Sequence, residues 1–335
     1  MTPERTGKRP VLVTGAAGFI GSQLVDALLA AGEVVVGIDC FTDFYAADIK
    51  ERNLAATLAY PNFTLVRADI ATMDLGELVG SASRVYHLAG QPGVRGSWGQ
   101  RFEEYARNNL LATQRLLEAC LAAGGTPLVY ASSSSAYGNL AVMPLREDMA
   151  LAPVSPYGVT KLAAEHLCRL YAAVYDLPTL SLRLFTVYGP RQRPDMAFSR
   201  FLTAAAAGEE ITLYGDGTQT RDFTFVGDVV AAFIAAGEVC ASPASAEGRS
   251  RGQVVNIAGG SRASINEVLA EVARLTGTRL RIRRLAPQPG DVQDTWADTT
   301  AARELLGFAP RVGLREGLAS EWEEIRRRAL GHTSG

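Results

Sequence analysis

Histidine and cysteine are scarce in this sequence, which has three histidines and four cysteines. The cysteines are Cys40, Cys120, Cys168 and Cys240, and their wide spacing matches no pattern of metal ligands. We therefore expect no metal site. Isolated cysteines of this kind are typical of a reducing compartment, so we expect a cytoplasmic protein.

Long apolar runs and an excess of one charge are also missing. No apolar run approaches the ~20 residues of a membrane-spanning helix, and residues 1–10 are polar, so we expect neither a membrane anchor nor a signal peptide. The formal net charge is −2, which gives no reason to expect nucleic acid or an anionic membrane as a partner. The 335 residues suffice for one large or two moderate globular domains.

The first half of the chain alternates short apolar runs with helical patterns. The apolar runs lie at 11–13, 34–38, 65–66, 85–88, 128–130 and 180–185. The helical patterns cover 18–31, 47–59, 101–123 and 156–176. This alternation predicts an α/β fold, a doubly wound parallel sheet of the Rossmann type with helices on both faces.

The alternation stops near residue 187, where turns become frequent and apolar runs shorten. We expect residues 1–185 to form the Rossmann domain and residues 186–335 to form a smaller, mixed α/β domain. The segment 222–239 is the exception, since its apolar pattern predicts a return to the first domain.

The stretch VTGAAGFIGS places Gly15, Gly18 and Gly21 at GxxGxxG spacing between the first strand and the first helix. Glycines let the backbone turn sharply and approach a pyrophosphate, which the N–H groups of the helix N-terminus then bind. A glycine-rich turn without a ligand is the alternative. The strand-turn-helix context favours a dinucleotide site, and we expect Phe19 and Ile20 to line it.

Asp39 ends the second strand, 18 residues after Gly21. A carboxylate there can accept hydrogen bonds from the hydroxyls of an adenosine ribose, and it would repel a 2′-phosphate. The next residues, Cys40 and Phe41, offer no cation for such a phosphate. We therefore expect NAD rather than NADP.

The ends of the third and fourth strands complete the cofactor prediction. Asp69 and Ile70 are placed to contact the adenine edge, although Asp69 could equally belong to a plain turn. Leu88 and Ala89, in the stretch HLAG, are expected to line the same pocket. His87 fits a buried strand-end histidine better than a base.

Ser133, in the stretch YASSSSAYGN, is followed 24 residues later by Tyr157, with Lys161 four positions further on. Residues at that last spacing share a helix face. Free tyrosine has a pKa of ~10, and lowering it by ~3 units takes ~4 kcal/mol, which an ammonium and a cationic nicotinamide can provide. Tyr157 is thus a candidate base. A chance pairing of Tyr and Lys is the alternative.

Together these stretches resemble extended short-chain dehydrogenase/reductases, the family of nucleotide-sugar epimerases, dehydratases and decarboxylases. The resemblance runs from VTGAAGFIGS through HLAG, SSSSAYG and SPYGVTK to QTRDFTFVGDV and PGDVQDTWAD. It implies NAD in the first domain and a UDP-sugar in the second. It also implies Ser133 as the catalytic hydroxyl, Tyr157 as the base, and Lys161 as the lysine that supports Tyr157 and the nicotinamide ribose.

Three stretches resemble UDP-glucuronate 4-epimerases, namely RLFTVYGPRQRPDMAF with Thr186, DCFTDFYAADIKERN and GQPGVRGSWG. Ser134 and Ser135 stand where family dehydratases carry an acidic pair, and the Glu of family decarboxylases is missing before the Tyr-Gly turn. The resemblance implies conversion of UDP-glucuronate to UDP-galacturonate. The alternatives are UDP-glucose 4-epimerase, UDP-glucuronate decarboxylase and, in another class, a catalytically inactive dinucleotide-sensing protein.

A glucuronate substrate carries a carboxylate beta to the ketone that oxidation at carbon 4 creates, and this group can leave as carbon dioxide. We hypothesise that hydroxyls hold the carboxylate at an angle that prevents its loss. The candidate donors are Ser133, Ser134, Ser135 and Thr186.

The resemblance also assigns the UDP end of the site. Arg221 in TRDF matches the family's diphosphate arginine, and Asp291 in PGDV matches its ribose-binding carboxylate. Arg95 and Arg193 are further candidates, since a guanidinium binds phosphate or carboxylate in bidentate fashion, and solvated surface arginines are the alternative. Gln288 stands where some UDP-galactose epimerases carry an arginine, so a neutral contact or another arginine must serve there.

The expected helices 101–123 and 156–176 are apolar on more than one face, as shown by Leu110, Leu117, Leu167 and Leu170. Family members commonly pair these two helices, so we expect a homodimer. Packing within one chain is the alternative.

Overall fold

The computed structural model describes residues 7–242, 251–288 and 290–331. Its main sheet is parallel throughout, with seven strands in the order β10-β6-β5-β4-β1-β2-β3. The strands are β1 (Val11–Thr14), β2 (Val35–Asp39), β3 (Phe63–Arg67), β4 (Arg84–His87), β5 (Leu128–Ser133), β6 (Thr179–Leu184) and β10 (Gln253–Ile257). The prediction of a doubly wound sheet is confirmed, because the strand order reverses at β1.

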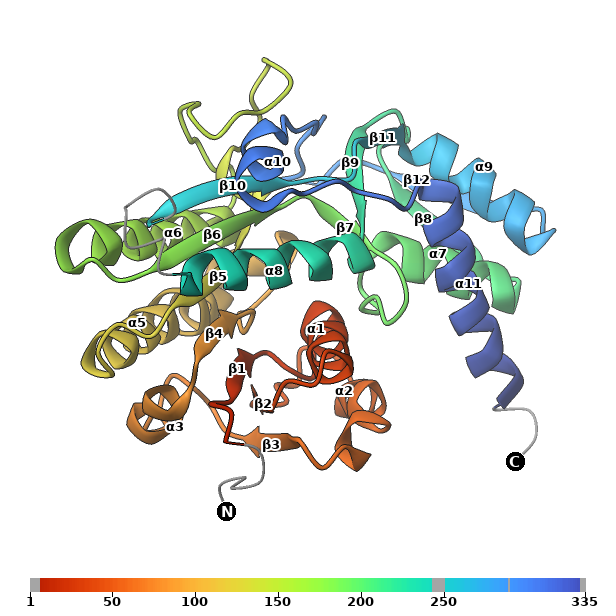
Figure 1. The fold of residues 1–335 in the computed structure, drawn as a ribbon. Coiled ribbons are helices and arrows are strands. Elements are labelled where there is room, and N and C mark those ends of the chain that lie inside the picture. The colour runs from red at the N-terminus through yellow and green to blue at the C-terminus, as the bar shows by residue number, and fades with distance from the viewer. Residues whose placement is uncertain (1–6, 243–250, 289, 332–335) are drawn as a thin grey trace.

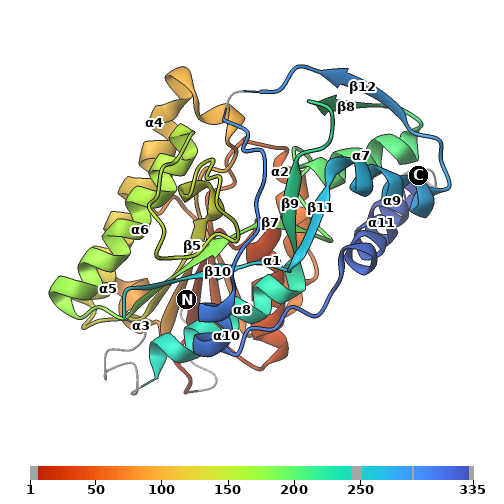
Figure 2. The same ribbon diagram turned by 90° about the horizontal axis from the view of Figure 1, so that it is seen from above.

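Helices cover both faces of this sheet (Figures 1 and 2). One face carries α1 (Phe19–Ala30), α8 (Val226–Ala241) and α10 (Thr300–Leu306). The opposite face carries α3 (Gly76–Ser81), α5 (Ala112–Ala122) and α6 (Pro156–Tyr175). Each layer buries its own apolar cluster against the strands, and this two-sided burial explains why the strands read as short continuous apolar runs.

Local sequence sets the ends of α6. The Ser155 side chain caps the N-terminus by accepting a hydrogen bond from the backbone N–H of Gly158, and Pro156 occupies the first turn. Asp176 ends the helix in the left-handed conformation, with a φ of 55°. The predicted range 156–176 is therefore confirmed to within a residue.

The predicted helix at 101–123 is less regular than its apolar pattern indicated. It consists of α4 (Phe102–Tyr105), a π-helical stretch (Ala106–Leu111) and α5. The wider π turns bring Asn109 against the loop after β4, where its side chain bonds both backbone groups of Gln91. The range predicted at 47–59 likewise divides into α2 (Ala47–Leu54) and a short 3₁₀ turn (Thr57–Ala59).

The remaining elements form a smaller mixed lobe around its own apolar cluster. A three-stranded sheet contains β11 (Ser261–Ser264), β9 (Thr220–Phe225) and β7 (Thr186–Tyr188), and a two-stranded sheet contains β12 (Arg281–Leu285) and β8 (Glu210–Tyr214). The helices are α7 (Ala197–Ala207), α9 (Ile265–Thr276) and α11 (Leu314–Gly331).

The chain crosses between the two lobes more than once. Helix α8 packs against α1 and against strands β4, β5 and β6, while the start of the segment 222–239 belongs to β9. Strand β10 pairs with β6 in the main sheet, although it lies within the range that we expected in the smaller domain. Strand β10 is only five residues long, and it belongs to the main sheet solely because it pairs with β6. The domain boundaries remain a prediction.

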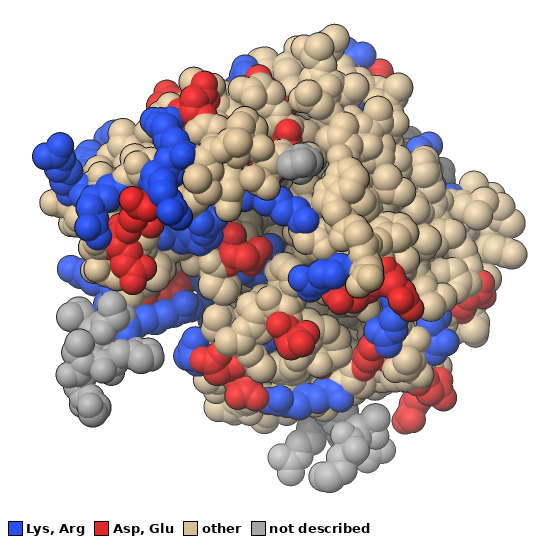
Figure 3. Space-filling view, turned by 180° about the vertical axis from the view of Figure 1, so that it is seen from behind, with Lys and Arg blue, Asp and Glu red and all other residues tan. Residues whose placement is uncertain are grey.

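Charged side chains of both signs are spread over the face in Figure 3, with Lys and Arg more frequent on one side. Strand β12 contributes three exposed arginines, and each contacts its own chain: Arg281 the Gly208 carbonyl, Arg283 the Glu210 carboxylate, and Arg284 the Asp216 carbonyl. Charges on an exposed edge strand hinder unwanted strand pairing, which accounts for this run without a ligand.

Candidate active site

The glycine turn between β1 and α1 is required by close packing. Gly15 has a φ of 71°, and a Cβ there would lie 2.8 Å from the backbone N of Ala89. A Cβ at Gly21 would lie 2.1 Å from the carbonyl oxygen of Gly15. No side chain caps the N-terminus of α1 at Gly18, so its N–H groups face the turn unblocked. These features fit a pyrophosphate on the helix N-terminus.

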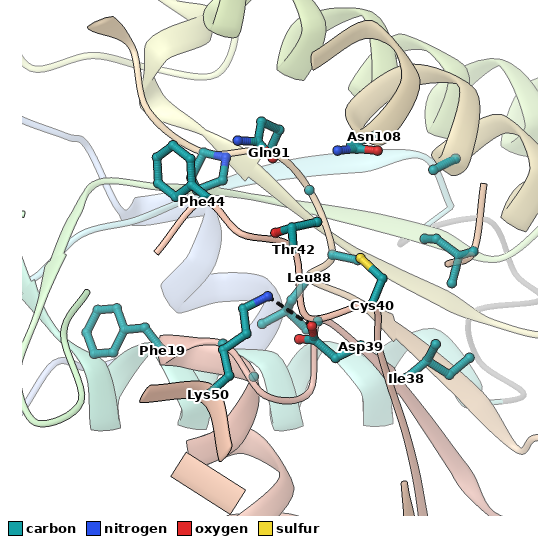
Figure 4. A pocket seen from close by; sticks show the side chains of 18 of the residues that line it. Phe19, Ile38, Asp39, Cys40, Thr42, Phe44, Lys50, Leu88, Gln91 and Asn108 are labelled. Carbon is teal, nitrogen blue, oxygen red and sulfur yellow. Dashed lines mark hydrogen bonds and ion pairs between the residues drawn. The ribbon is translucent and has the colours of Figure 1, made fainter. Parts of the chain in front are cut away.

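A pocket extends from this turn along the carboxyl edge of the sheet (Figure 4). Every residue predicted around the cofactor from the glycine turn and the first four strands lines it: Gly15, Gly18, Phe19, Ile20, Gly21, Asp39, Asp69, Ile70, Leu88 and Ala89. The sequence thus predicted the wall of the pocket correctly, and the wall fits an extended dinucleotide. The hydrogen bonds of each residue to NAD remain predictions.

Asp39 has a cationic neighbour that no sequence motif indicated. Lys50, on α2, places its Nζ 2.9 Å from Asp39 Oδ1 (Figure 4). Backbone N–H groups of Phe41 and Ala17 also donate to the Asp39 carboxylate, at 2.8 and 3.1 Å. The adjacent positions on which the prediction rested, Cys40 and Phe41, carry no cation. Because Lys50 already pairs with the Asp39 carboxylate, it is not available to bind a 2′-phosphate. The predicted preference for NAD over NADP is therefore unaffected.

Asp69 lines the pocket and also organises its own turn. One of its oxygens accepts a hydrogen bond from the backbone N–H of Ala71 at 2.8 Å, and the other pairs with Arg107 at 2.5 Å. The turn interpretation of Asp69 is therefore confirmed, and its contact with the adenine edge remains a prediction. Arg107, from the π-helical stretch, is a second cation that the sequence did not indicate.

His87 is a buried structural residue, as predicted. Its Nδ1 lies 2.7 Å from Thr14 Oγ1 and its Nε2 lies 2.9 Å from Thr113 Oγ1. Burial, together with the nearby Lys161 ammonium, lowers the pKa of His87 to about 3. The imidazole is therefore neutral at pH 7 and has both nitrogens engaged.

Tyr157 and Lys161 lie on the first turns of α6, beside the end of β5 that carries Ser133. Burial raises the pKa of Tyr157, while a hydrogen bond with Ser133 and the Arg193 guanidinium lower it. Burial lowers the pKa of Lys161 to about 8. The protein alone thus keeps Tyr157 protonated, and the groups that oppose this are Ser133 and Arg193 rather than the expected Lys161.

The four serines divide between two surroundings. Ser132 is buried and donates a hydrogen bond to the Glu165 carboxylate at 2.7 Å. Ser133 is 9% exposed, and its Oγ accepts a hydrogen bond from the backbone N–H of Ser135. Ser134, Ser135 and Thr186 are partly exposed. Three of the four proposed hydroxyl donors, Ser134, Ser135 and Thr186, are therefore accessible, whereas Ser133 is nearly buried and Ser132 belongs to the core.

The residues predicted for the UDP end form a cluster in which Arg95 and Asp291 pair at 2.6 Å. Arg221 is held beside them by the carbonyl oxygens of Val292 and Gln293, at 2.6 and 3.0 Å. The Arg95 guanidinium also stacks on the ring of Tyr214, 4.2 Å from its centroid. Tyr214 was not among the predicted residues, since an aromatic at a strand end is not distinctive in sequence.

Arg193 lies apart from this cluster. It pairs with Asp195 at 2.9 Å and lines the cofactor pocket near Phe44, whose ring centroid is 5.8 Å from the guanidinium. The Gln288 side chain donates a long hydrogen bond to the Ala286 carbonyl at 3.5 Å, and its backbone carbonyl accepts one from the Asp291 N–H at 3.4 Å. Arg193 therefore lies at the cofactor pocket and not in the cluster of Arg95 and Arg221. Contacts of these arginines with UDP remain predictions.

Residues 11–258 match the family model described as the NAD dependent epimerase/dehydratase family. The chain belongs to this family. Among curated proteins, it is 41% identical to a Bacillus subtilis protein named "Uncharacterized UDP-glucose epimerase YtcB", over 93% of this chain and 96% of the other. Members of the family depend on NAD, so the pocket described above is the NAD pocket.

Two solved structures of family members are similar along the whole chain. UDP-glucuronic acid 4-epimerase from Bacillus cereus, in complex with UDP-glucuronic acid and NAD, is 42% identical with a TM-score of 0.88, over 95% of this chain and 99% of the other. MoeE5 in complex with UDP-glucuronic acid and NAD is 46% identical with a TM-score of 0.83, at the same coverage. MoeE5 also has a structure with UDP-glucose and NAD.

Two further findings concern metals and membranes. Within residues 7–242, 251–288 and 290–331, no group of three or more His, Cys, Asp or Glu side chains could hold a metal ion. No helix in the same ranges has the length and apolar character needed to cross a membrane.

Proposed function

We propose that the chain is a UDP-glucuronate 4-epimerase that converts UDP-glucuronate to UDP-galacturonate. The observation that carries the proposal is the placement of Tyr157 and Lys161 on the first turns of α6, beside the end of β5 that carries Ser133, with Ser134, Ser135 and Thr186 partly exposed. The similarity to the Bacillus cereus epimerase supports the same substrate.

The glycine turn and Asp39 would hold NAD, which would supply a reversible hydride acceptor for carbon 4 of the sugar. Tyr157 takes the proton of the 4-hydroxyl as general base and gives one back as general acid. Ser133 holds the same hydroxyl and favours the phenolate through its hydrogen bond. Lys161, one helical turn after Tyr157, is placed to bind the nicotinamide ribose.

The cluster of Arg95, Arg221 and Asp291 is proposed to hold the UDP group. Arg221 is the diphosphate arginine and Asp291 is the ribose-binding carboxylate. Because Gln288 carries no charge, Arg95 is proposed to bind the diphosphate in its place. Because Arg95 and Asp291 pair with each other at 2.6 Å, the nucleotide has to exchange that contact for its own.

UDP-glucose remains the second candidate substrate, because MoeE5 also has a structure with UDP-glucose. The catalytically inactive alternative is disfavoured, since Tyr157 and Lys161 are both present on α6 beside Ser133. Decarboxylation is disfavoured because no Glu precedes the Tyr137-Gly138 turn.

Purified protein, incubated without added cofactor, tests the proposal. UDP-glucuronate, UDP-glucose and UDP-xylose are supplied separately and products are identified by proton NMR. We expect UDP-galacturonate as the main product and no pentose. Turnover of UDP-glucose far above that of UDP-glucuronate would overturn the substrate assignment.

We propose in addition a homodimer that pairs α6 and the helix before it. Exposed apolar side chains on these elements are Leu111, Val159, Leu170 and Val174, each about half exposed. Leu117, by contrast, is buried in the core, so part of the apolar pattern reflects packing within the chain. Light scattering after size exclusion gives the mass. A monomer at micromolar concentration would refute the dimer.

We also propose a cytoplasmic location. Cys40, Cys120 and Cys168 form no disulfide in the described part of the chain, which agrees with a reducing compartment.

A further inference from the structure

A row of buried polar residues crosses the main sheet directly behind the catalytic serine. In the parallel register, Ser132 of β5 lies beside Arg183 of β6, and Arg183 lies beside Asn256 of β10. These three residues are at most 2% exposed. Strands of a parallel sheet covered on both faces are normally apolar, so a polar row across three of them requires its own partners.

Glu165 of α6 supplies the first partner. Its Oε2 accepts hydrogen bonds from Ser132 Oγ at 2.7 Å and from Arg183 Nε at 2.9 Å, and its Oε1 accepts one from Arg183 Nη2 at 2.6 Å. Glu165 lies one helical turn beyond Lys161. One carboxylate therefore connects the helix that carries the base to the strand that carries the catalytic hydroxyl.

Tyr137 connects the other end of the serine stretch to the same row. Its hydroxyl donates to Asn256 Oδ1 at 2.8 Å, and the Arg183 guanidinium lies 4.7 Å from its ring centroid. The Asn256 side-chain amide in turn donates to the Leu145 carbonyl at 2.9 Å. Both residues that flank Ser133–Ala136 therefore interact with the Arg183 guanidinium, Ser132 through Glu165 and Tyr137 through its ring.

We propose that the Glu165–Arg183 pair acts as a positioning unit that sets the distance between Ser133 and Tyr157. Ser132 and Ser133 are consecutive strand residues whose side chains point to opposite faces, so anchoring Ser132 to α6 also anchors Ser133. The pair is fully buried, with side chains 1% and 0% exposed. Buried pairs of this kind are often no more stabilising than apolar residues of the same volume, which favours a geometric role.

Ser132→Ala is the most conservative test, because it removes only the hydroxyl between Glu165 and the strand. We expect kcat to fall about tenfold or more, with KM nearly unchanged, since small misplacements of reacting groups are costly. The acid limb of the kcat/KM profile should move to higher pH, because Ser133, which lowers the pKa of Tyr157, would shift away from the phenol. Ser132→Thr keeps a hydroxyl and should restore most of kcat.

Ser181→Ala provides the matched control. Ser181 is 1% exposed on β6, two residues before Arg183 and on the same face, but it makes no contact with Glu165 or Tyr137 in the described structure. It should leave kcat and the acid limb unchanged. The proposal is overturned if the two variants have the same kcat and the same acid limb, whether both are fully active or both are impaired. Glu165→Gln, which weakens both Arg183 contacts, should reproduce the Ser132→Ala profile.

The inference rests on the proposed function only for its turnover readout. Assays with both UDP-glucuronate and UDP-glucose separate the two questions, since the ratio of variant to wild-type rate tests the positioning unit on whichever sugar reacts. An ultraviolet titration of tyrosinate in the NAD-loaded protein, with the Tyr157→Phe spectrum subtracted in each background, needs no turnover. An unchanged Tyr157 titration in Ser132→Ala would refute the proposal even if the substrate assignment also failed.

Discussion

The Lys50 ammonium lies 2.9 Å from the Asp39 carboxylate, with side chains 9% and 4% exposed. The two residues come from different elements, the end of β2 and the helix α2, and they meet in the wall of the NAD pocket. The lysine balances a carboxylate charge that would otherwise be unpaired in a buried site.

Replacing Lys50 by methionine should leave that carboxylate buried without its cation. We expect the free energy of unfolding to fall by about 3 kcal/mol, in line with broken buried pairs. Urea unfolding followed by circular dichroism measures it. Arg52→Met is the control, because Arg52 pairs with Asp48 in an exposed position and such pairs contribute about 1 kcal/mol or less. Equal losses in the two variants would contradict the buried-pair argument.

Tyr157→Phe should reduce kcat by about 10²–10⁴-fold, the range typical of a lost general acid–base group. Folding and NAD content should be unchanged, because the substitution removes one hydroxyl and keeps the ring, which packs edge-on against Tyr105. The measurement is UDP-sugar turnover by NMR together with the absorbance of bound cofactor. Tyr175→Phe, on the same helix and 56% exposed, is the control. A fully active Tyr157→Phe protein would disprove the mechanism.

His87 should make the fold sensitive to acid. Its pKa is lowered to about 3 in the folded protein, below the ordinary value of 6.5, so the unfolded chain binds a proton first as pH falls. Stability is therefore complete above pH 6.5 and declines by about 1.4 kcal/mol per unit as pH falls below that value toward 3. His87→Gln should flatten this slope in urea unfolding between pH 6 and 4. His166→Gln, which changes an exposed histidine, should not.

Loss of the hydroxyls around the sugar should release carbon dioxide. If Ser134 and Thr186 restrain the substrate carboxylate, the double variant to alanine lets it turn perpendicular to the ketone at carbon 4. We expect a UDP-pentose product that the wild type does not form, detected by NMR, with carbon dioxide measured in parallel. A slower reaction that still yields only UDP-galacturonate would rule out the restraint.

Arg95 should act in binding rather than in chemistry. Arg95→Met removes a charge-assisted contact to the UDP group, so we expect KM to rise about tenfold, equivalent to about 1.4 kcal/mol, with little change in kcat. Arg101→Met is the control, since Arg101 pairs with Glu104 on the exposed surface. A fall in kcat with unchanged KM would place Arg95 near the reacting carbon instead.

Much of the fold and of the NAD pocket was predictable because local sequence determines it. Alternating runs and helices specify a parallel sheet, and the glycines at 15, 18 and 21 are demanded by a turn that leaves no space for a Cβ. The order of Ser133, Tyr157 and Lys161 along the chain likewise fixed their placement, since a strand end and the first turns of a helix meet at the same edge of the sheet.

Only the tertiary structure decided which charges meet. Lys50 with Asp39, Arg107 with Asp69, Arg95 with Asp291, and Arg183 with Glu165 are pairs between separate elements, at spacings that no periodic pattern encodes. The same holds for β10, a five-residue strand that becomes part of the main sheet only by pairing with β6. Side-chain pairing over long sequence separation depends on the packed arrangement of whole elements, and that arrangement also determines which groups lower the pKa of Tyr157.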